Sequence, residues 1–191
     1  MMTCIVVGAL TGTVLPGQEE NERLVRSLFI SDPELIGAGY LPEVLSGEIW
    51  RVFTPIFLHF GVIHILCNMS WLWHLGCMVE ARRGSGLLAA FVAISAAISN
   101  LAQYQFGGGP SFGGMSGVVA ALIGYVWMQG KYNRAAGLYL DPRSLSMALI
   151  FMALCFIAPF LRVANAAHLG GLIVGVVWGR LAAFRASRQP E

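Results

Sequence analysis

The segment FGGMSGVVAALIGYVW, residues 112–127, joins a glycine-rich loop to a predicted apolar helix. Ser116 stands between Gly114 and Gly117 at the predicted start of that helix. Glycine permits positive φ and close approach of a substrate, and a helix N-terminus offers unpaired N–H groups with partial positive charge. A serine there has backbone donors ready for an oxyanion. The alternative is a structural serine that bonds to its own backbone or to a neighbouring helix.

The composition is that of a membrane protein. Of the 191 residues, 57% are hydrophobic and 12% are charged, and the mean hydropathy is +0.69. A soluble domain carries about 25% charged residues, so this chain has too few charges to cover a water-facing surface. The net charge of +2 and the lack of a basic run argue against nucleic acid as a partner. We therefore expect an all-α, multi-pass integral membrane protein with a single domain over residues 1–191.

Six apolar segments predict six membrane-spanning helices, several of them slightly shorter than the ~20 residues that cross a bilayer. The first has no basic region before it and no cleavage motif after it, which favours a span over a cleaved signal and leaves open a native start upstream of Met1. Residues 17–61 form a mixed, membrane-associated outer loop. The predicted spans are residues 2–16, 62–79, 87–102, 116–130, 145–161 and 166–184.

The charges of the connecting segments sort into two sets. Segments 80–86 and 131–144 and the C-terminal tail, counted together with Arg180 near the end of the last span, hold eight basic and three acidic residues. Segments 17–61, 103–115 and 162–165 hold four basic and seven acidic ones. An excess of Lys and Arg marks cytoplasmic segments. We therefore expect both termini in the cytoplasm of a bacterial cell, with the protein in the inner membrane and the polar ends of three parallel spans near the outer face.

His168 is a candidate partner for Ser116. An ionisable group inside a span is expensive and indicates function by default, although a histidine that only packs between helices is the alternative. Gly171, Gly175 and Gly179 follow at intervals of four, and such a stripe lets another helix come very close. A serine needs a base within hydrogen-bond reach to act as a nucleophile. Spans 116–130 and 166–184 contain no Asp or Glu, so the expected mechanism uses a Ser–His dyad.

Two further polar residues share one face of the 62–79 span. His64 and Asn68 are four residues apart, and both can donate hydrogen bonds to a developing oxyanion. A metal site built from His59 and His64 fails on ligand count, and the four cysteines form no CxxC pair, so we expect no metal, disulfide or cofactor. The inner halves of spans 116–130 and 166–184 are expected to be apolar, which argues against a small transporter.

These residues resemble the rhomboid intramembrane serine proteases of the bacterial six-span type. A GxSG motif alone is weak, but here it is combined with HxxxN upstream and AHxxG downstream, each on a separate span. The blocks that carry the resemblance are WRVFTPIFLHFGVIHILCN at 50–68, VEARRGSG at 79–86, FGGMSGVVAALIGYVW at 112–127 and ANAAHLGGLIVG at 164–175.

The resemblance implies roles that agree with the reasoning from the residues. Ser116 would be the nucleophile and His168 the general base of a six-helix rhomboid bundle. The implied oxyanion hole comprises His64, Asn68 and the backbone N–H groups of Met115 and Ser116. The implied supporting residues are Trp50, Arg51, His59, Gly114, Gly117, Asn165 and Gly171.

The expected activity is cleavage of membrane-protein substrates within or near their transmembrane segments. One departure from the family pattern is Ala120, where the family usually has an aromatic residue that packs on the catalytic histidine. This departure leaves open an inactive relative that binds membrane proteins without cutting them. The sequence does not indicate the oligomeric state, the client protein or its cleavage site.

Overall fold

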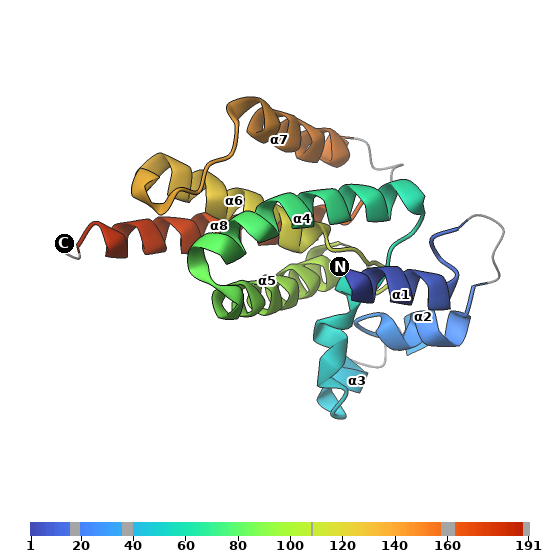
Figure 1. Cartoon of the computed structure of the whole chain (residues 1–191). Helices are drawn as coiled ribbons and strands as arrows, with labels where there is room; N and C mark the ends of the chain where they lie inside the picture. Colours follow the sequence, from blue (N-terminus) through green and yellow to red (C-terminus); the bar gives the residue numbers. More distant parts are fainter. Residues whose placement is uncertain (16–19, 36–39, 108, 158–162, 189–191) are drawn as a thin grey trace.

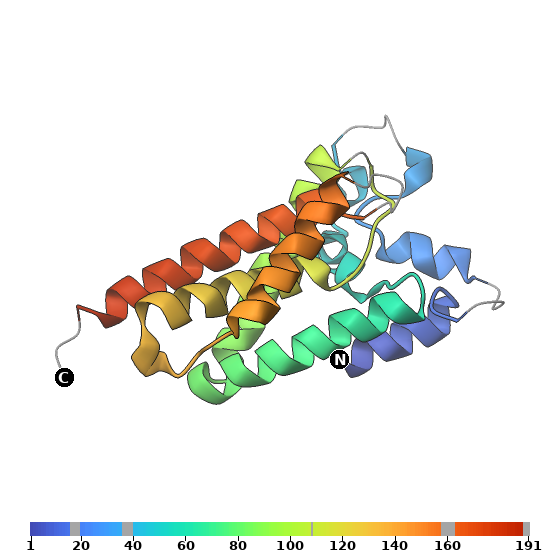
Figure 2. The same ribbon diagram turned by 90° about the horizontal axis from the view of Figure 1, so that it is seen from above.

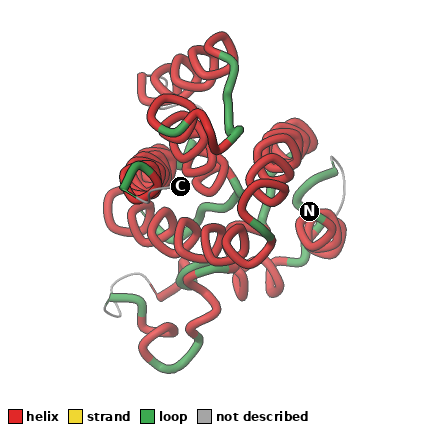
Figure 3. Tube along the Cα trace, turned by 60° about the vertical axis from the view of Figure 1, so that its left-hand side comes forward, coloured by secondary structure: helices red, strands yellow, loops and turns green. Residues whose placement is uncertain are grey.

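The protein is described by a computed structural model that covers residues 1–15, 20–35, 40–107, 109–157 and 163–188. Every regular element in this part of the chain is helical, and short loops join the helices (Figures 1 and 3). The elements are α1 (Met2–Thr11), α2 (Glu22–Leu28), η1 (Pro33–Leu35), α3 (Pro42–Leu45), η2 (Ile49–Val52), η3 (Thr54–Phe57), α4 (Val62–Arg83), α5 (Ser85–Phe106), α6 (Ser116–Tyr132), η4 (Arg134–Ala136), α7 (Pro142–Ile157) and α8 (Asn165–Ala186).

Three helices of the described chain are long and apolar enough to cross a membrane. They are α4, α5 and α8, each of 22 residues, which corresponds to about 33 Å at the α-helical rise. Helices α1 and α7 are apolar but shorter. The all-helical architecture is confirmed, whereas length and composition support three spans and leave the expected total of six as a prediction.

The ends of several helices differ from the predicted spans. The first helix ends at Thr11, well before residue 16, because Gly12 takes the left-handed conformation with φ 71°. Helix α4 continues beyond residue 79 to Arg83, since a charged last turn does not break a helix, and Gly84 with φ 82° ends it. Helix α5 is likewise longer than 87–102. Positions 158–161 of the fifth predicted span lie outside the described residues.

Helix α6 is the central element of the bundle, with α8, α5 and α4 packed around it (Figures 1 and 2). Twelve of its seventeen residues are buried, so little of its surface faces outward. Its contact with α8 is especially close, because a Cβ at Gly171 or Gly175 would overlap the backbone of α6. At Gly124 a Cβ would lie 2.8 Å from the carbonyl oxygen of Leu172. The close approach predicted from the glycine stripe is confirmed.

The C-terminal half of α6, which was expected to be apolar, contains a buried polar residue. Gln129 is fully buried, and its Nε2 donates to the Gly179 carbonyl oxygen at 2.6 Å. Its Oε1 accepts from Arg83 Nη2 at 2.7 Å and from Asn133 Nδ2 at 3.1 Å. A buried amide requires such partners. Arg83, which the sequence places among the loop charges, therefore folds back onto α6 and connects α4, α6 and α8.

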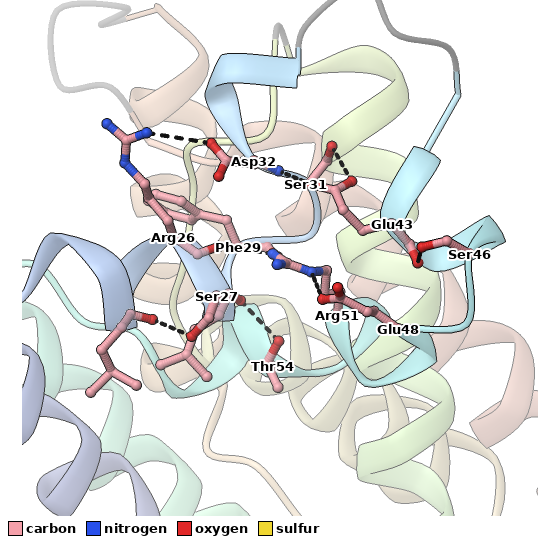
Figure 4. Close-up of polar contacts among 12 residues, drawn as sticks. Arg26, Ser27, Phe29, Ser31, Asp32, Glu43, Ser46, Glu48, Arg51 and Thr54 are labelled. Atoms are coloured by element: carbon pink, nitrogen blue, oxygen red, sulfur yellow. Dashed lines mark hydrogen bonds and ion pairs between the residues drawn. The ribbon is translucent and has the colours of Figure 1, made fainter.

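The segment between α1 and α4 lies at the opposite end of the bundle from the end of α8 (Figure 1), and polar contacts connect its parts (Figure 4). Arg51 donates to Glu48 at 2.6 Å and to the carbonyl oxygens of Arg26 and Phe29 at 2.8 and 3.1 Å. The buried Glu43 accepts from Ser31 Oγ at 2.8 Å and from the Asp32 N–H at 2.5 Å. These bonds position residues 53–60, which reach the candidate site.

Candidate active site

Ser116 and His168 touch. The hydroxyl Oγ of Ser116 and Nε2 of His168 are 2.8 Å apart, although 52 residues separate the two in the sequence. Ser116 is the first residue of α6, and His168 lies in the first turn of α8. The close packing of these two helices brings the side chains together, as the glycine stripe after His168 predicts.

The glycine loop before Ser116 is fixed by the segment that precedes α4. The N–H of Gly114 donates to the Pro55 carbonyl oxygen at 2.9 Å, and a Cβ at Gly113 would lie 2.6 Å from Leu58 Cβ. Gly114 has φ +122°, a conformation that L side chains rarely adopt. Glycine is therefore required twice here, once for close approach and once for backbone conformation.

The ring of His64 lies beside Ser116. A Cβ at Gly114 would lie 2.7 Å from His64 Nε2 and 3.7 Å from Ser116 Oγ, so only a glycine leaves room between them. The Nδ1 of His64 accepts from the Phe60 N–H at 3.2 Å. In the neutral ring the proton is then on Nε2, which makes the nitrogen that faces Gly114 a hydrogen-bond donor.

Asn68 is buried one turn after His64, on the same face of α4. Its Nδ2 donates to the His64 carbonyl oxygen at 2.9 Å. An amide nitrogen carries two N–H bonds, so one donor is engaged within the helix and the second is left for another acceptor.

His59 holds a backbone group that the family resemblance assigns to the oxyanion hole. Its ring is fully buried, with Nδ1 3.2 Å from the Phe57 carbonyl oxygen and Nε2 3.4 Å from the Met115 nitrogen. Nδ1 therefore donates and Nε2 accepts the Met115 N–H. Burial, reinforced by the nearby His64 ring, lowers the pKa of His59 to about 4, so the ring is neutral at physiological pH. The Met115 N–H is thus directed at His59, and its role in an oxyanion hole stays a prediction.

The sequence profile of the Rhomboid domain matches residues 46–184. The chain belongs to the rhomboid family. Proteins named "Rhomboid protease GlpG" from Salmonella paratyphi A (strain ATCC 9150 / SARB42), Salmonella newport (strain SL254) and Salmonella typhi are each 47% identical to it over 134 residues. The aligned region is 70% of this chain and 48% of each relative, so the chain spans about half the length of the curated relatives it matches. The resemblance noted in the sequence is confirmed.

Within this rhomboid chain, two glycines allow α6 and α8 to pack closely enough for Ser116 and His168 to meet. A Cβ at Gly117 would meet Ser99 Cβ at 2.6 Å and the Ala167 carbonyl oxygen at 3.3 Å, and one at Gly171 would overlap the backbone of Gly117. Asn165 begins α8, and its Nδ2 donates to the Cys155 carbonyl oxygen of α7 at 2.9 Å. Both glycines act through close packing, and Asn165 joins α7 to α8.

Trp50 and Arg51 lie in η2 rather than beside Ser116. Trp50 is 52% exposed and Arg51 is buried. The hydrogen bonds of Arg51 go to the loop that contains η2, and none reaches the Ser116–His168 pair. In the ranges described above, no three His, Cys, Asp or Glu side chains come together as metal ligands.

Sequence reasoning missed Gln103, a buried residue near the end of α5. Its Oε1 accepts the N–H of Ala167 at 3.1 Å, which is one of the N–H groups of α8 without a partner in its own helix. Helix α8 has no side-chain cap of its own. A signal was present, because Ser95, Ser99 and Gln103 recur every four residues in an apolar segment and so share one helix face.

Proposed function

We propose that this rhomboid chain is an intramembrane serine endopeptidase in which Ser116 is the nucleophile and His168 the general base. The observation that carries the proposal is the 2.8 Å contact between Ser116 Oγ and His168 Nε2. Family membership and the protease name of relatives that are 47% identical support it. A nucleophile and a base in hydrogen-bond contact are the minimum arrangement for acyl transfer.

The chemistry follows from this contact. Ser116 Oγ attacks the scissile carbonyl carbon while Nε2 of His168 takes the hydroxyl proton. When the tetrahedral intermediate collapses, His168 returns that proton to the leaving amine nitrogen, and a water molecule then repeats the sequence to release the acyl group. The Nδ1 of His168 is shielded and has no partner among the described residues. The proposal is therefore a dyad, without a carboxylate that orients the base.

The oxyanion that forms on the carbonyl oxygen needs donors. His64 Nε2–H lies beside Ser116, and the second N–H of Asn68 and the backbone N–H of Ser116 are the other candidates. The Met115 N–H contributes only if a substrate oxygen replaces His59 as its acceptor. The contact to be replaced is long, at 3.4 Å. His59 would otherwise act as a positioning residue for the glycine loop.

For the membrane, we propose one domain over residues 1–191 in which α1 and α4–α8 make up six spans. The excess of basic residues in the segments after α4 and α6 and in the C-terminal tail supports cytoplasmic termini. The site would then open to the outer side of a bacterial inner membrane. Water would reach Ser116 from that side, as hydrolysis requires.

The proposed substrates are transmembrane proteins whose spans unwind locally near the outer face. A peptide bond inside a helix is sterically shielded and already hydrogen-bonded, so it has to leave the helix before Ser116 can attack it. Small or helix-breaking residues near the cleaved bond would make this easier. Substrates with uniformly Leu-rich spans should be cut more slowly than those that contain Gly or Pro.

The test is reconstitution of the whole chain in liposomes with a labelled model span, combined with labelling by a fluorophosphonate probe. The native chain should cleave the span and react with the probe. Ser116→Ala and His168→Ala should each reduce cleavage by about 10³-fold or more, and the double variant should be no worse, because the two groups act as a unit.

A matched control is Ser111→Ala, which changes an exposed serine in the same loop. It should leave cleavage and labelling near the native values. If the folded native chain neither cleaves the model span nor reacts with the probe, the proposed protease activity is refuted. The alternative is then the inactive relative that binds membrane proteins, which the alanine at position 120 leaves open.

A further inference from the structure

Among the described residues, the arginines in the last turn of α4 form no ion pair. In the described part of the chain, the ion pairs join Arg26 to Asp32 and Glu34, and Arg51 to Glu48, all within the segment between α1 and α4. Arg82 and Arg83 lie at the opposite end of the molecule, where α4 and α6 finish (Figure 1). In the described chain neither guanidinium forms an ion pair with a carboxylate, although Glu80 lies on the same end of α4.

The two arginines bracket the turn that follows α6. Arg83 Nη2 donates to Gln129 Oε1 at 2.7 Å, in the last part of α6. The guanidinium of Arg82 lies against Gly137, where an added Cβ would be 2.7 to 3.0 Å from its Cζ, Nη1 and Nη2 atoms. Between these contacts runs η4, which contributes the exposed Arg134. The guanidinium groups of Arg82 and Arg83 thus lie at one junction of α4 and α6, and Arg134 belongs to the short helix that follows α6.

The hydrogen bonding of Arg83 is incomplete. Its Nε is shielded from solvent and has no partner among the described residues. The other neighbours of the guanidinium are neutral groups, the Gln129 amide oxygen and the Tyr125 hydroxyl. A guanidinium has five N–H donors in a planar fork that matches the oxygens of carboxylate and phosphate. Because Arg83 has only neutral partners and Arg82 is exposed, an anionic oxygen that approaches this end from outside would be stabilised by charge-assisted hydrogen bonds to the accessible guanidinium nitrogens.

We propose that the phosphate of an anionic phospholipid headgroup binds at this junction, between Arg82 and Arg83 and beside Arg134. A lipid is favoured as the source because α4 is long and apolar enough to span a membrane and ends at Arg83. The guanidinium groups therefore lie at the depth of the headgroups. Basic pockets between helices on the cytoplasmic side are a general mode of headgroup binding. The proposal does not depend on the chemistry of Ser116.

The test uses the whole chain, purified in neutral alkyl-maltoside micelles, and phosphatidylglycerol with a fluorescent acyl chain and an intact headgroup. Binding is followed by fluorescence anisotropy. Unlabelled phosphatidylglycerol should compete, whereas phosphatidylcholine and inorganic phosphate should not. Replacing Arg82 and Arg83 by Gln should weaken binding by about 25-fold, since each arginine near an anionic surface contributes about a fivefold effect.

The matched control removes two positive charges elsewhere on the same side, with Arg143→Gln and Arg185→Gln, both at exposed positions. It should change the affinity by less than about twofold if the site is specific. If the Arg83 variant fails to fold, Arg82→Gln alone decides, because it leaves the Arg83–Gln129 bond in place. The proposal is overturned if the Arg82 variants bind like the native chain, if the control loses as much affinity, or if inorganic phosphate competes equally well.

Discussion

Ser116 and His168 each follow a residue whose backbone N–H donates a hydrogen bond to a side chain of another segment. The N–H of Met115 donates to His59, and that of Ala167 donates to Gln103. Neither α6 nor α8 has a side-chain cap of its own at this end. The first turns of a helix otherwise leave their N–H groups without partners. Side chains distant in sequence thus fix where the two reactive helices begin.

Gln103→Leu should separate a positioning role from simple packing. The substitution leaves the buried N–H of Ala167 without an acceptor, at a cost of about 1 to 3 kcal/mol. If His168 shifts as a result, fluorophosphonate labelling of Ser116 should slow by about tenfold, which corresponds to ~1.4 kcal/mol. Gln103→Glu keeps an acceptor and should restore most of the rate.

The control for this change is Gln105→Leu, two residues later and exposed, which should label at the native rate. The positioning role of Gln103 is refuted if Gln103→Leu labels like the native chain, or if Gln103→Glu is as slow as Gln103→Leu.

At the scale of the helices, apolar runs predict which segments are helical but not where each helix ends. The glycine stripe after His168 predicted the α6–α8 contact, because close packing needs small residues at fixed spacing. The sequence did not predict the last turn of α4, because its charged residues are typical of a loop outside the membrane. The helix ends only at Gly84, which has a positive φ. Gln129 was missed for a related reason, since its partner Arg83 comes from another helix and nothing local pairs them.

The segment between α1 and α4 depends on one buried carboxylate. Burial alone would raise the pKa of Glu43, but the N–H of Asp32, its own N–H, the Ser31 hydroxyl and the charge of Arg51 hold this pKa below its ordinary value. A carboxylate with a lowered folded-state pKa stabilises the fold above its unfolded pKa of about 4.3. That stabilisation is lost as the pH falls through the folded pKa.

Glu43→Gln should therefore lower the melting temperature at pH 7, and the difference from the native chain should shrink as the pH falls towards 3. Thermal unfolding followed by tryptophan fluorescence across this range measures the difference. Glu34→Gln is the control, because that side chain is 70% exposed and should show only a small effect at any pH. A Glu43→Gln difference that stays constant with pH would contradict the argument.

Across the whole molecule, charged side chains form different contacts at the two ends of the helix bundle. Ion pairs and buried carboxylate contacts lie in the segment between α1 and α4. Arg82 and Arg83 in the last turn of α4, and Arg134 after α6, form no ion pair within the described chain. A membrane protein with this asymmetry is expected to place its basic end in the cytoplasm, where the leaflet is anionic. The serine–histidine pair lies near the other end, so the orientation decides from which side water and substrate reach it.

The orientation can be tested with single cysteines and a membrane-impermeant thiol reagent on intact cells. Glu34→Cys lies in the segment between α1 and α4, and Arg185→Cys lies at the end of α8, both at exposed positions. Glu34→Cys should be labelled in intact cells, and Arg185→Cys only after the membrane is permeabilised. The unsubstituted chain controls for its own thiols, of which Cys4 and Cys155 are buried and Cys67 and Cys77 are exposed on α4. Labelling of Arg185→Cys in intact cells would place the basic end outside, and the site would then have to draw its water from the cytoplasm.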